Sequence, residues 1–152
     1  MRRKDKEITD KAELESILNE AYVCRIALCS DNIPYIVPMN FAYKNNFLYM
    51  HSFPEGKKID LINKNSNVCF EAETKNEIVK SDSACSWGMK FMSVIGSGTA
   101  SIVADEAQKI EALNIIMEKY SGKSDWEFSD SMDKIAVIKI QVKEMSGKKS
   151  GY

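Results

Sequence analysis

The stretch "YMHSFPEGKKIDLI" (residues 49–62) contains the point at which the chain changes from strand to helix. Its first residues continue an aromatic and apolar run typical of a strand, along which His51 and Ser52 point to opposite faces. A proline and a glycine then predict a turn, and the apolar spacing that follows predicts a short helix over residues 56–65. The single histidine of the chain is therefore expected just before a helix N-terminus.

The first turn of this expected helix carries Lys57 and Lys58, although cations are unfavourable at the positive end of a helix dipole. Unpaired backbone amides at a helix N-terminus bind phosphate groups, and an anion there would remove the conflict. Together with His51 and Ser52, the lysines predict an anion site. Two other interpretations stay open at this stage, because the lysines can be solvated surface charges and His51 can be a hydrogen-bonded structural residue.

Short runs rich in aromatic and β-branched residues surround this junction, as expected for successive antiparallel strands. Turn signals such as "DN" and "KNN" separate the first of them. The expected strands cover residues 22–30, 33–43, 46–52, 67–73, 90–103 and 135–145.

Two further helices are expected, over residues 10–21 and 105–122, because each run opens with a capping-box spacing and continues with apolar residues at helical intervals. The longer helix ends at Gly122, and its expected core-facing stripe consists of Ile110, Leu113, Met117 and Tyr120. In the strand before it, Gly96 and Gly98 lie on one face, which marks a bend or a close approach by another group. Six or seven strands with added helices favour a small barrel.

The bulk composition predicts one domain spanning residues 1–152. A hydrophobic content of 44% and a charged content of 28% are ordinary for a globular protein, and the formal net charge of -1 provides no basic field for nucleic acid. The first ten residues, "MRRKDKEITD", lack the apolar centre of a signal peptide, and no run approaches the roughly 18 apolar residues of a membrane span. We therefore expect a cytoplasmic protein without a nucleic-acid or membrane partner.

The four cysteines form no CxxC pair, so we expect free thiols that are buried as small hydrophobic side chains. Cys24 and Cys29 lie five apart on a strand and point to opposite faces, so they predict no zinc site with His51. No local signature supports Cys69 or Cys85 as a nucleophile. We expect no metal site, and the sequence assigns no catalytic residue.

The ordered segments "CRIALCSDNIPYIVPMNFAY", "LYMHSFPEGKKIDLI", "VCFEAE", "ACSWGMKFMSVIGSGTASIV" and "IAVIKIQVKEMSGKKS" resemble the pyridoxamine-phosphate-oxidase-like flavin split barrels, specifically their nitroimidazole-resistance branch. The resemblance covers residues 2–150. It implies a mainly β fold, a six-stranded antiparallel split β-barrel with flanking α-helices. It also implies a homodimer that holds FMN between its subunits.

The same resemblance assigns residues to the FMN site. Contacts to the FMN phosphate are implied for His51, Ser52, Lys57 and Lys58. The strand implied to lie along the isoalloxazine ring carries Val37, Pro38, Met39 and Asn40. The partner subunit is implied to add Ser93, Val94 and Ile95. Residues implied to lie near the cleft, without an assigned role, are Cys85, Ser86 and Trp87.

One departure from the family pattern concerns substrate. Pyridoxamine-phosphate oxidases carry an arginine-bearing C-terminal segment that holds the substrate phosphate, whereas this chain has "EMSGKKSGY". This departure speaks against vitamin B6 oxidation. The resemblance leads to the hypothesis of an FMN-dependent oxidoreductase that passes electrons from a nicotinamide donor to a small flat acceptor such as a nitroaromatic. One alternative is a non-catalytic flavin or haem carrier. Another is a protein that binds or breaks down haem, with His51 as the axial ligand. The sequence contains no GxGxxG motif after a strand, so it predicts no dedicated nicotinamide domain.

Overall fold

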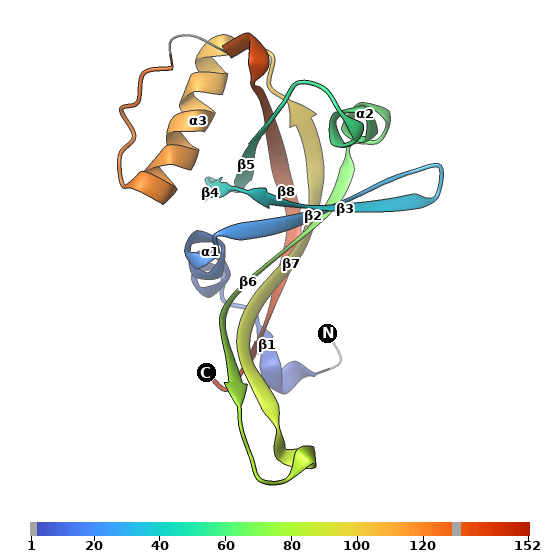
Figure 1. Ribbon diagram of the computed structural model, residues 1–152, viewed down its shortest axis with the longest axis vertical. Coiled ribbons are helices and arrows are strands. Elements are labelled where there is room, and N and C mark those ends of the chain that lie inside the picture. Colours follow the sequence, from blue (N-terminus) through green and yellow to red (C-terminus); the bar gives the residue numbers. More distant parts are fainter. Residues whose placement is uncertain (1–2, 129–131) are drawn as a thin grey trace.

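The computed structural model describes residues 3–128 and 132–152. One antiparallel sheet forms the body of the molecule, and helices pack against it (Figure 1). The helices are α1 (Lys11–Glu20), α2 (Lys57–Lys64) and α3 (Glu106–Ser121). The strands are β1 (Glu7–Ile8), β2 (Val23–Ser30), β3 (Ile33–Asn40), β4 (Ala42–Lys44), β5 (Phe47–Ser52), β6 (Asn67–Val79), β7 (Gly88–Ile102) and β8 (Ala136–Ser150).

The strand order shows that the sheet curls into a barrel. Neighbouring strands follow the order β3-β2-β6-β7-β8-β5-β4, and β1 pairs with β8. In a flat sheet, β3 and β4 would lie about 29 Å apart, at roughly 4.8 Å per strand spacing. Only Phe41 separates these two strands in the chain, and one intervening residue bridges at most about 7 Å. The two ends of the sheet must therefore meet at Phe41.

The expected split β-barrel with flanking helices is confirmed. The described residues form eight strands instead of six, for two reasons. The two-residue strand β1 adds to the edge of β8, and the strand expected over residues 33–43 is divided at Phe41 into β3 and β4. Within these residues, no helix has the length and apolar character that crossing a membrane requires.

The expected helix ends are also confirmed. The Glu13 amide donates to the Asp10 carboxylate at 2.8 Å, and the Gln108 amide donates to the Asp105 carboxylate at 2.9 Å. Helix α3 ends at Gly122, whose φ of 75° lies in the left-handed region that glycine adopts without strain. These caps are local interactions, which is why the sequence pattern placed them correctly.

The expected stripe on α3 is only partly correct. The buried residues are Ala112, Leu113, Ile115 and Ile116, a wider set than one stripe. The reason is that α3 covers two apolar patches: Ala112 and Leu113 pack with Val103 and Val137, whereas Ile115 and Ile116 pack with Ala42. The main core lies on the other side of the sheet, against α1 and α2.

Strands β6 and β7 extend beyond the barrel as a paired arm, defined here as residues 75–90 (Figure 1). The sequence analysis assigned no structure to most of this segment. The expectation of buried cysteines is also wrong, because only Cys24 is buried. Cys29 and Cys69 lie on the outward face of their strands, and Cys85 lies in the turn at the tip of the arm.

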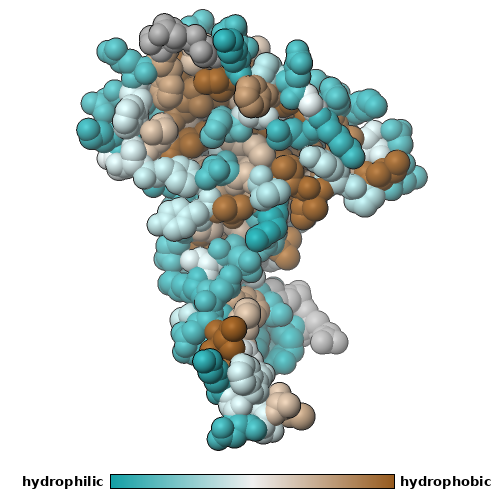
Figure 2. All heavy atoms as spheres, in the orientation of Figure 1, coloured by the Kyte–Doolittle hydropathy of each residue, from teal (hydrophilic) through white to brown (hydrophobic). Residues whose placement is uncertain are grey.

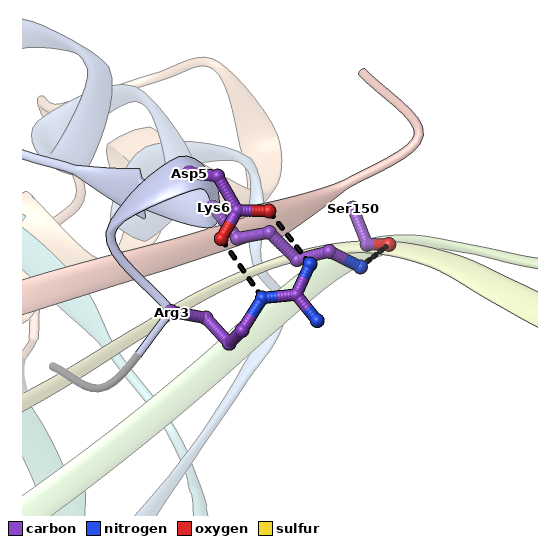
Figure 3. A network of polar contacts seen from close by, with 4 residues as sticks. All are labelled: Arg3, Asp5, Lys6 and Ser150. Carbon is purple, nitrogen blue, oxygen red and sulfur yellow. Dashed lines mark hydrogen bonds and ion pairs between the residues drawn. The ribbon is translucent and has the colours of Figure 1, made fainter.

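The N-terminal segment is held against the end of β8 (Figure 3). Arg3 donates two hydrogen bonds to Asp5, at 2.8 and 2.6 Å, and the Arg3 hydrogen bond lowers the pKa of Asp5 to about 2. The Lys6 ammonium donates to the Ser150 hydroxyl at 2.7 Å. The Lys6–Ser150 contact joins residues from opposite ends of the sequence, whereas the Arg3–Asp5 contacts are local.

Phe41, the residue that closes the barrel, is fully buried and is held by the last turn of α3. Its amide donates to the Tyr120 hydroxyl at 3.0 Å. The Lys119 ammonium lies 3.6 Å from the centroid of the Phe41 ring and donates to the Leu18 carbonyl at 2.9 Å. Both contacts favour the charged form of Lys119, but burial is the dominant effect and lowers its pKa to about 8.

Gly96 and Gly98 lie where β7 bends against β8. The register shifts between Ser97 and Gly98, and an added Cβ at Gly96 would lie 2.6 Å from the Glu144 carbonyl oxygen and 2.7 Å from Cε1 of Phe70. The close approach expected from the sequence is thus made by the chain itself, through the Phe70 ring and the β8 backbone.

Gly96→Ala is predicted to lower the free energy of unfolding by about 1–3 kcal/mol, because the added methyl group overpacks this contact. Gly88→Ala is the matched control in the same strand, since its Cβ would meet only Val79 Cβ at 3.9 Å. Urea denaturation of both variants measures the difference. Equal stability of the two variants would show that the bend does not require glycine.

Lys119→Met is predicted to change how stability depends on pH. The folded pKa of about 8 lies below the ordinary value of 10.5, so unfolding takes up a proton between these values. The free energy of unfolding of the wild type should therefore rise relative to that of the variant from about pH 8 to about pH 10, by ~1 kcal/mol after solvent screening. Parallel stability curves in urea would contradict this assignment.

Candidate functional site

A cleft of about 380 Å³ opens where the ends of β3 and β5 meet the start of α2. The segment just before β8 forms its remaining wall. The residues that line it are Pro38, Met39, Asn40, His51, Ser52, Phe53, Lys58, Lys134 and Ile135. Six of them belong to the site expected from the sequence.

The polar corner of the cleft lies at the N-terminus of α2. The Lys58 ammonium donates to the Ser52 hydroxyl at 2.8 Å, which holds both groups at the end of β5. Gly56 occupies the N-cap position with φ 117°, and no side chain caps the first amides of α2. An ammonium, a hydroxyl and helix-end amides therefore converge, and each of them binds phosphate oxygens.

The two adjacent lysines have different environments. Lys58 is partly buried and lines the cleft, whereas the Lys57 ammonium lies 4.7 Å from the centroid of the Tyr35 ring. This distance is within the range of a cation–π interaction. Lys57 does not line the cleft, so the expected pair of phosphate ligands is divided between two locations.

His51 lies on an exposed position of β5, opposite Val137 of β8. The expected alternation along this strand is confirmed, because Leu48 and Met50 are fully buried in the main core while His51 faces outward. The imidazole is therefore accessible from the cleft. It can donate or accept a hydrogen bond there.

The apolar wall of the cleft comes mainly from the end of β3. Pro38 and Asn40 are exposed, and Met39 is partly buried against the main core. Val37 also packs against that core and does not line the cleft. This end of β3 offers a ligand a mixed surface with one amide side chain.

The three residues expected from the partner subunit lie elsewhere in this chain. Ser93, Val94 and Ile95 occupy the middle of β7, between β6 and β8. Val94 is fully buried in the main core, and Ile95 is 53% exposed. Ile95 lines a separate cavity of about 310 Å³ with Cys69 and Glu144. Trp87, expected near the cleft, lies at the tip of the arm and is 53% exposed.

Sequence reasoning missed three residues of the cleft: Phe53, Lys134 and Ile135. The antiparallel pairing of Ser52 with Ala136 places the residues that follow β5 beside those that precede β8. Only this register could have identified Lys134 and Ile135. Phe53 is 77% exposed and directly follows Ser52. Its position as an apolar ring at the end of a strand was the sequence signal that could have placed it in the cleft.

The cleft thus has a cationic, hydroxyl-bearing corner and a flatter apolar wall. This combination suits a ligand that joins a phosphate group to a planar ring. Among residues 3–128 and 132–152, no three or more His, Cys, Asp or Glu side chains cluster in a way that could hold a metal ion.

Comparison with known proteins identifies related structures. A candidate 5-nitroimidazole antibiotic resistance protein from Bacteroides thetaiotaomicron VPI-5482 is 36% identical, with 93% of this chain and 85% of that chain covered and a TM-score of 0.80. An FAD- and haem-binding protein from Mycobacterium smegmatis is 16% identical, with coverages of 97% and 74% and a TM-score of 0.85. The latter likeness concerns the fold alone.

An uncharacterised protein from Rhizobium meliloti (strain 1021) is 34% identical over 64 residues, which span 42% of this chain and 42% of that relative. The family model for pyridoxamine 5'-phosphate oxidase matches residues 10–149, nearly the whole chain. With its split barrel and its similarity to the nitroimidazole-resistance protein, the chain belongs to the pyridoxamine 5'-phosphate oxidase family.

Proposed function

We propose that this chain is an FMN-binding flavoprotein, a single split-barrel domain over residues 1–152 that acts as an oxidoreductase. In this proposal it passes electrons from a nicotinamide donor to a small flat acceptor such as a nitroaromatic. The observation that carries the proposal is the cleft beside the N-terminus of α2. The Lys58–Ser52 pair occupies its polar corner, and Pro38, Met39 and Asn40 form its wall.

The chain's own residues support the proposed binding of a phosphate. Lys58 supplies a positive charge that Ser52 already orients, and the uncapped amides of α2 supply further donors. His51 lies on the adjacent wall and can add one hydrogen bond. Lys57 adds positive charge from its position over Tyr35. A dianionic group is held best by such charge-assisted contacts.

The other end of the cleft suits the ring system. FMN, when bound, supplies the hydride and electron transfer chemistry of the reaction. Pro38 and Met39 offer apolar contact, and Phe53 and Ile135 add further apolar side chains to the lining. The Asn40 side chain offers a donor and an acceptor to polar ring atoms.

A homodimer is part of the proposal. Figure 2 shows apolar side chains at the surface of the β2–β3 hairpin and of the arm. Ile36 of β3 is 62% exposed, and the paired Ile78 and Met89 of the arm are 57% and 50% exposed. Ile78 and Met89 are neighbours across the arm, and adjacent exposed apolar side chains of this kind occur at protein contact sites. In the proposed dimer, Ser93, Val94 and Ile95 of the second subunit complete the cleft.

Vitamin B6 oxidation is not part of the proposal. The segment 144–152 contains no arginine, and several of its side chains make internal contacts. The Lys149 ammonium donates to the Glu13 carboxylate at 2.7 Å, and the Tyr152 hydroxyl donates to the Lys75 carbonyl at 2.8 Å. These side chains therefore stabilise the fold, and we assign them no contact with a substrate phosphate.

Lys58→Met is predicted to weaken FMN binding at least tenfold, about 1.4 kcal/mol or more, because it removes a charge-assisted contact from the phosphate. Lys57→Met should weaken binding less, and Lys64→Met, at the far end of α2, should leave it unchanged. Fluorescence titration of each apoprotein with FMN, and with FAD and riboflavin for comparison, measures these affinities. Equal FMN affinity in the Lys58 and Lys64 variants would remove the phosphate assignment.

Anaerobic addition of NADH or NADPH is predicted to bleach the visible absorption of the flavin-loaded protein, and a nitroaromatic should then restore it. A flavin spectrum that neither nicotinamide bleaches would favour the carrier alternative. Because His51 is accessible from the cleft, the same preparation is tested with haem. A Soret band with no flavin binding would replace the flavin proposal by a haem-binding one.

A further inference from the structure

Phe41 is the only residue between β3 and β4, and neither of these strands includes it in a ladder. It is fully buried, so its backbone amide and carbonyl need partners other than water. The Tyr120 hydroxyl is that partner. It accepts the Phe41 amide at 3.0 Å and lies 3.2 Å from the Phe41 carbonyl oxygen.

The same hydroxyl also reaches the strand next to β3. Its shortest hydrogen bond, at 2.6 Å, goes to the carbonyl of Tyr22. Tyr22 directly precedes β2, whose first residue, Val23, pairs with Asn40. One hydroxyl therefore ties together the residue before Val23 and the residue after Asn40. A tyrosine hydroxyl has one donor hydrogen, so the Tyr22 carbonyl at 2.6 Å is its main acceptor and the Phe41 carbonyl at 3.2 Å shares the same hydrogen. The hydroxyl oxygen accepts the Phe41 amide at the same time.

We propose that Tyr120 is a positioning residue for the cleft, because its hydroxyl fixes the peptide that follows Asn40 and so fixes where the Asn40 amide points. Lys119 holds the ring of the same Phe41 at 3.6 Å. Two consecutive residues of α3 thus contact Phe41, Tyr120 through the backbone and Lys119 through the ring. Neither of them lines the cleft. The part of this inference that concerns flavin rests on the proposed function.

Tyr120→Phe removes the hydroxyl and keeps the ring. The matched control is Tyr43→Phe in the neighbouring strand β4. The Tyr43 hydroxyl also makes a partly buried hydrogen bond, which it donates to the Glu15 carboxylate at 2.8 Å. Each variant loses one tyrosine hydroxyl and the hydrogen bonds that it makes, so both should lose stability. Only the Tyr120 variant should alter the cleft.

Two measurements on the flavin-free protein test the positioning itself. We expect hydrogen exchange of the Phe41 amide to become at least tenfold faster in Tyr120→Phe, and the side-chain amide NMR signals of Asn40 to shift. In Tyr43→Phe both should match the wild type. Unchanged Asn40 signals in Tyr120→Phe, or the same shift in both variants, would overturn the inference.

Two further measurements use the FMN-loaded protein. Tyr120→Phe should weaken FMN binding at least threefold and should shift the flavin absorption maxima, whereas Tyr43→Phe should change neither. If the wild type binds no FMN, the proposed function fails while the amide measurements still decide the role of Tyr120. If the wild type binds FMN and the two variants bind it equally, the inference fails while the proposed function stands.

If Tyr120→Phe does not fold, a protein with 3-fluorotyrosine in place of Tyr120 is tested instead. This substitution retains the ring and makes the hydroxyl more acidic. The altered hydrogen-bond strength should shift the Asn40 side-chain signals in the folded protein. Identical Asn40 signals with tyrosine and fluorotyrosine would overturn the inference as well.

Discussion

The barrel depends on one covalent constraint: a single residue, Phe41, joins the strands at the two ends of the sheet order. Because β3 and β4 are consecutive in the chain, the sheet cannot remain open. Closure brings the end of β3 near β5, and it thereby places Asn40 and His51 on one cleft. The backbone groups of Phe41 have no place in a strand ladder at this point, and the Tyr120 hydroxyl accepts the Phe41 amide and lies 3.2 Å from the Phe41 carbonyl oxygen. Helix α3 thus contributes to the cleft without lining it.

Local patterns predicted most of the fold because the interactions behind them are local. The caps at Asp10 and Asp105 bind amides three residues away, and the alternation in β5 and β8 follows directly from strand geometry. The break at Phe41 was missed because an aromatic residue fits an uninterrupted strand. The arm was missed because much of its sequence is polar, and its outer strands pair only with each other.

The cleft was harder to predict because it depends on orientation and register. Lys57 and Lys58 are chemically identical, and the turn of about 100° between adjacent helical residues sends one to Tyr35 and the other to the cleft. Lys134 joins the cleft only through the pairing of β5 with β8. Tyr120 was placed correctly on α3, but the apolar pattern gave no indication that its hydroxyl would bond to a backbone 79 residues earlier.

The register of the sheet also limits how a second subunit could complete the cleft. Pro38 pairs with Arg25, Arg25 with Glu71, and Glu71 with Ile95, so these four residues form one row on the outward face. Arg25 and Glu71 form an ion pair at 3.1 Å in the middle of the row, which leaves apolar groups at its ends. Two copies packed on this face about a two-fold axis can bring Ile95 of one copy to Pro38 of the other, and the reverse. Alternation along β7 points Ser93 and Ile95 outward and Val94 into the core, so Val94 can contact a ligand of the second subunit only through its backbone.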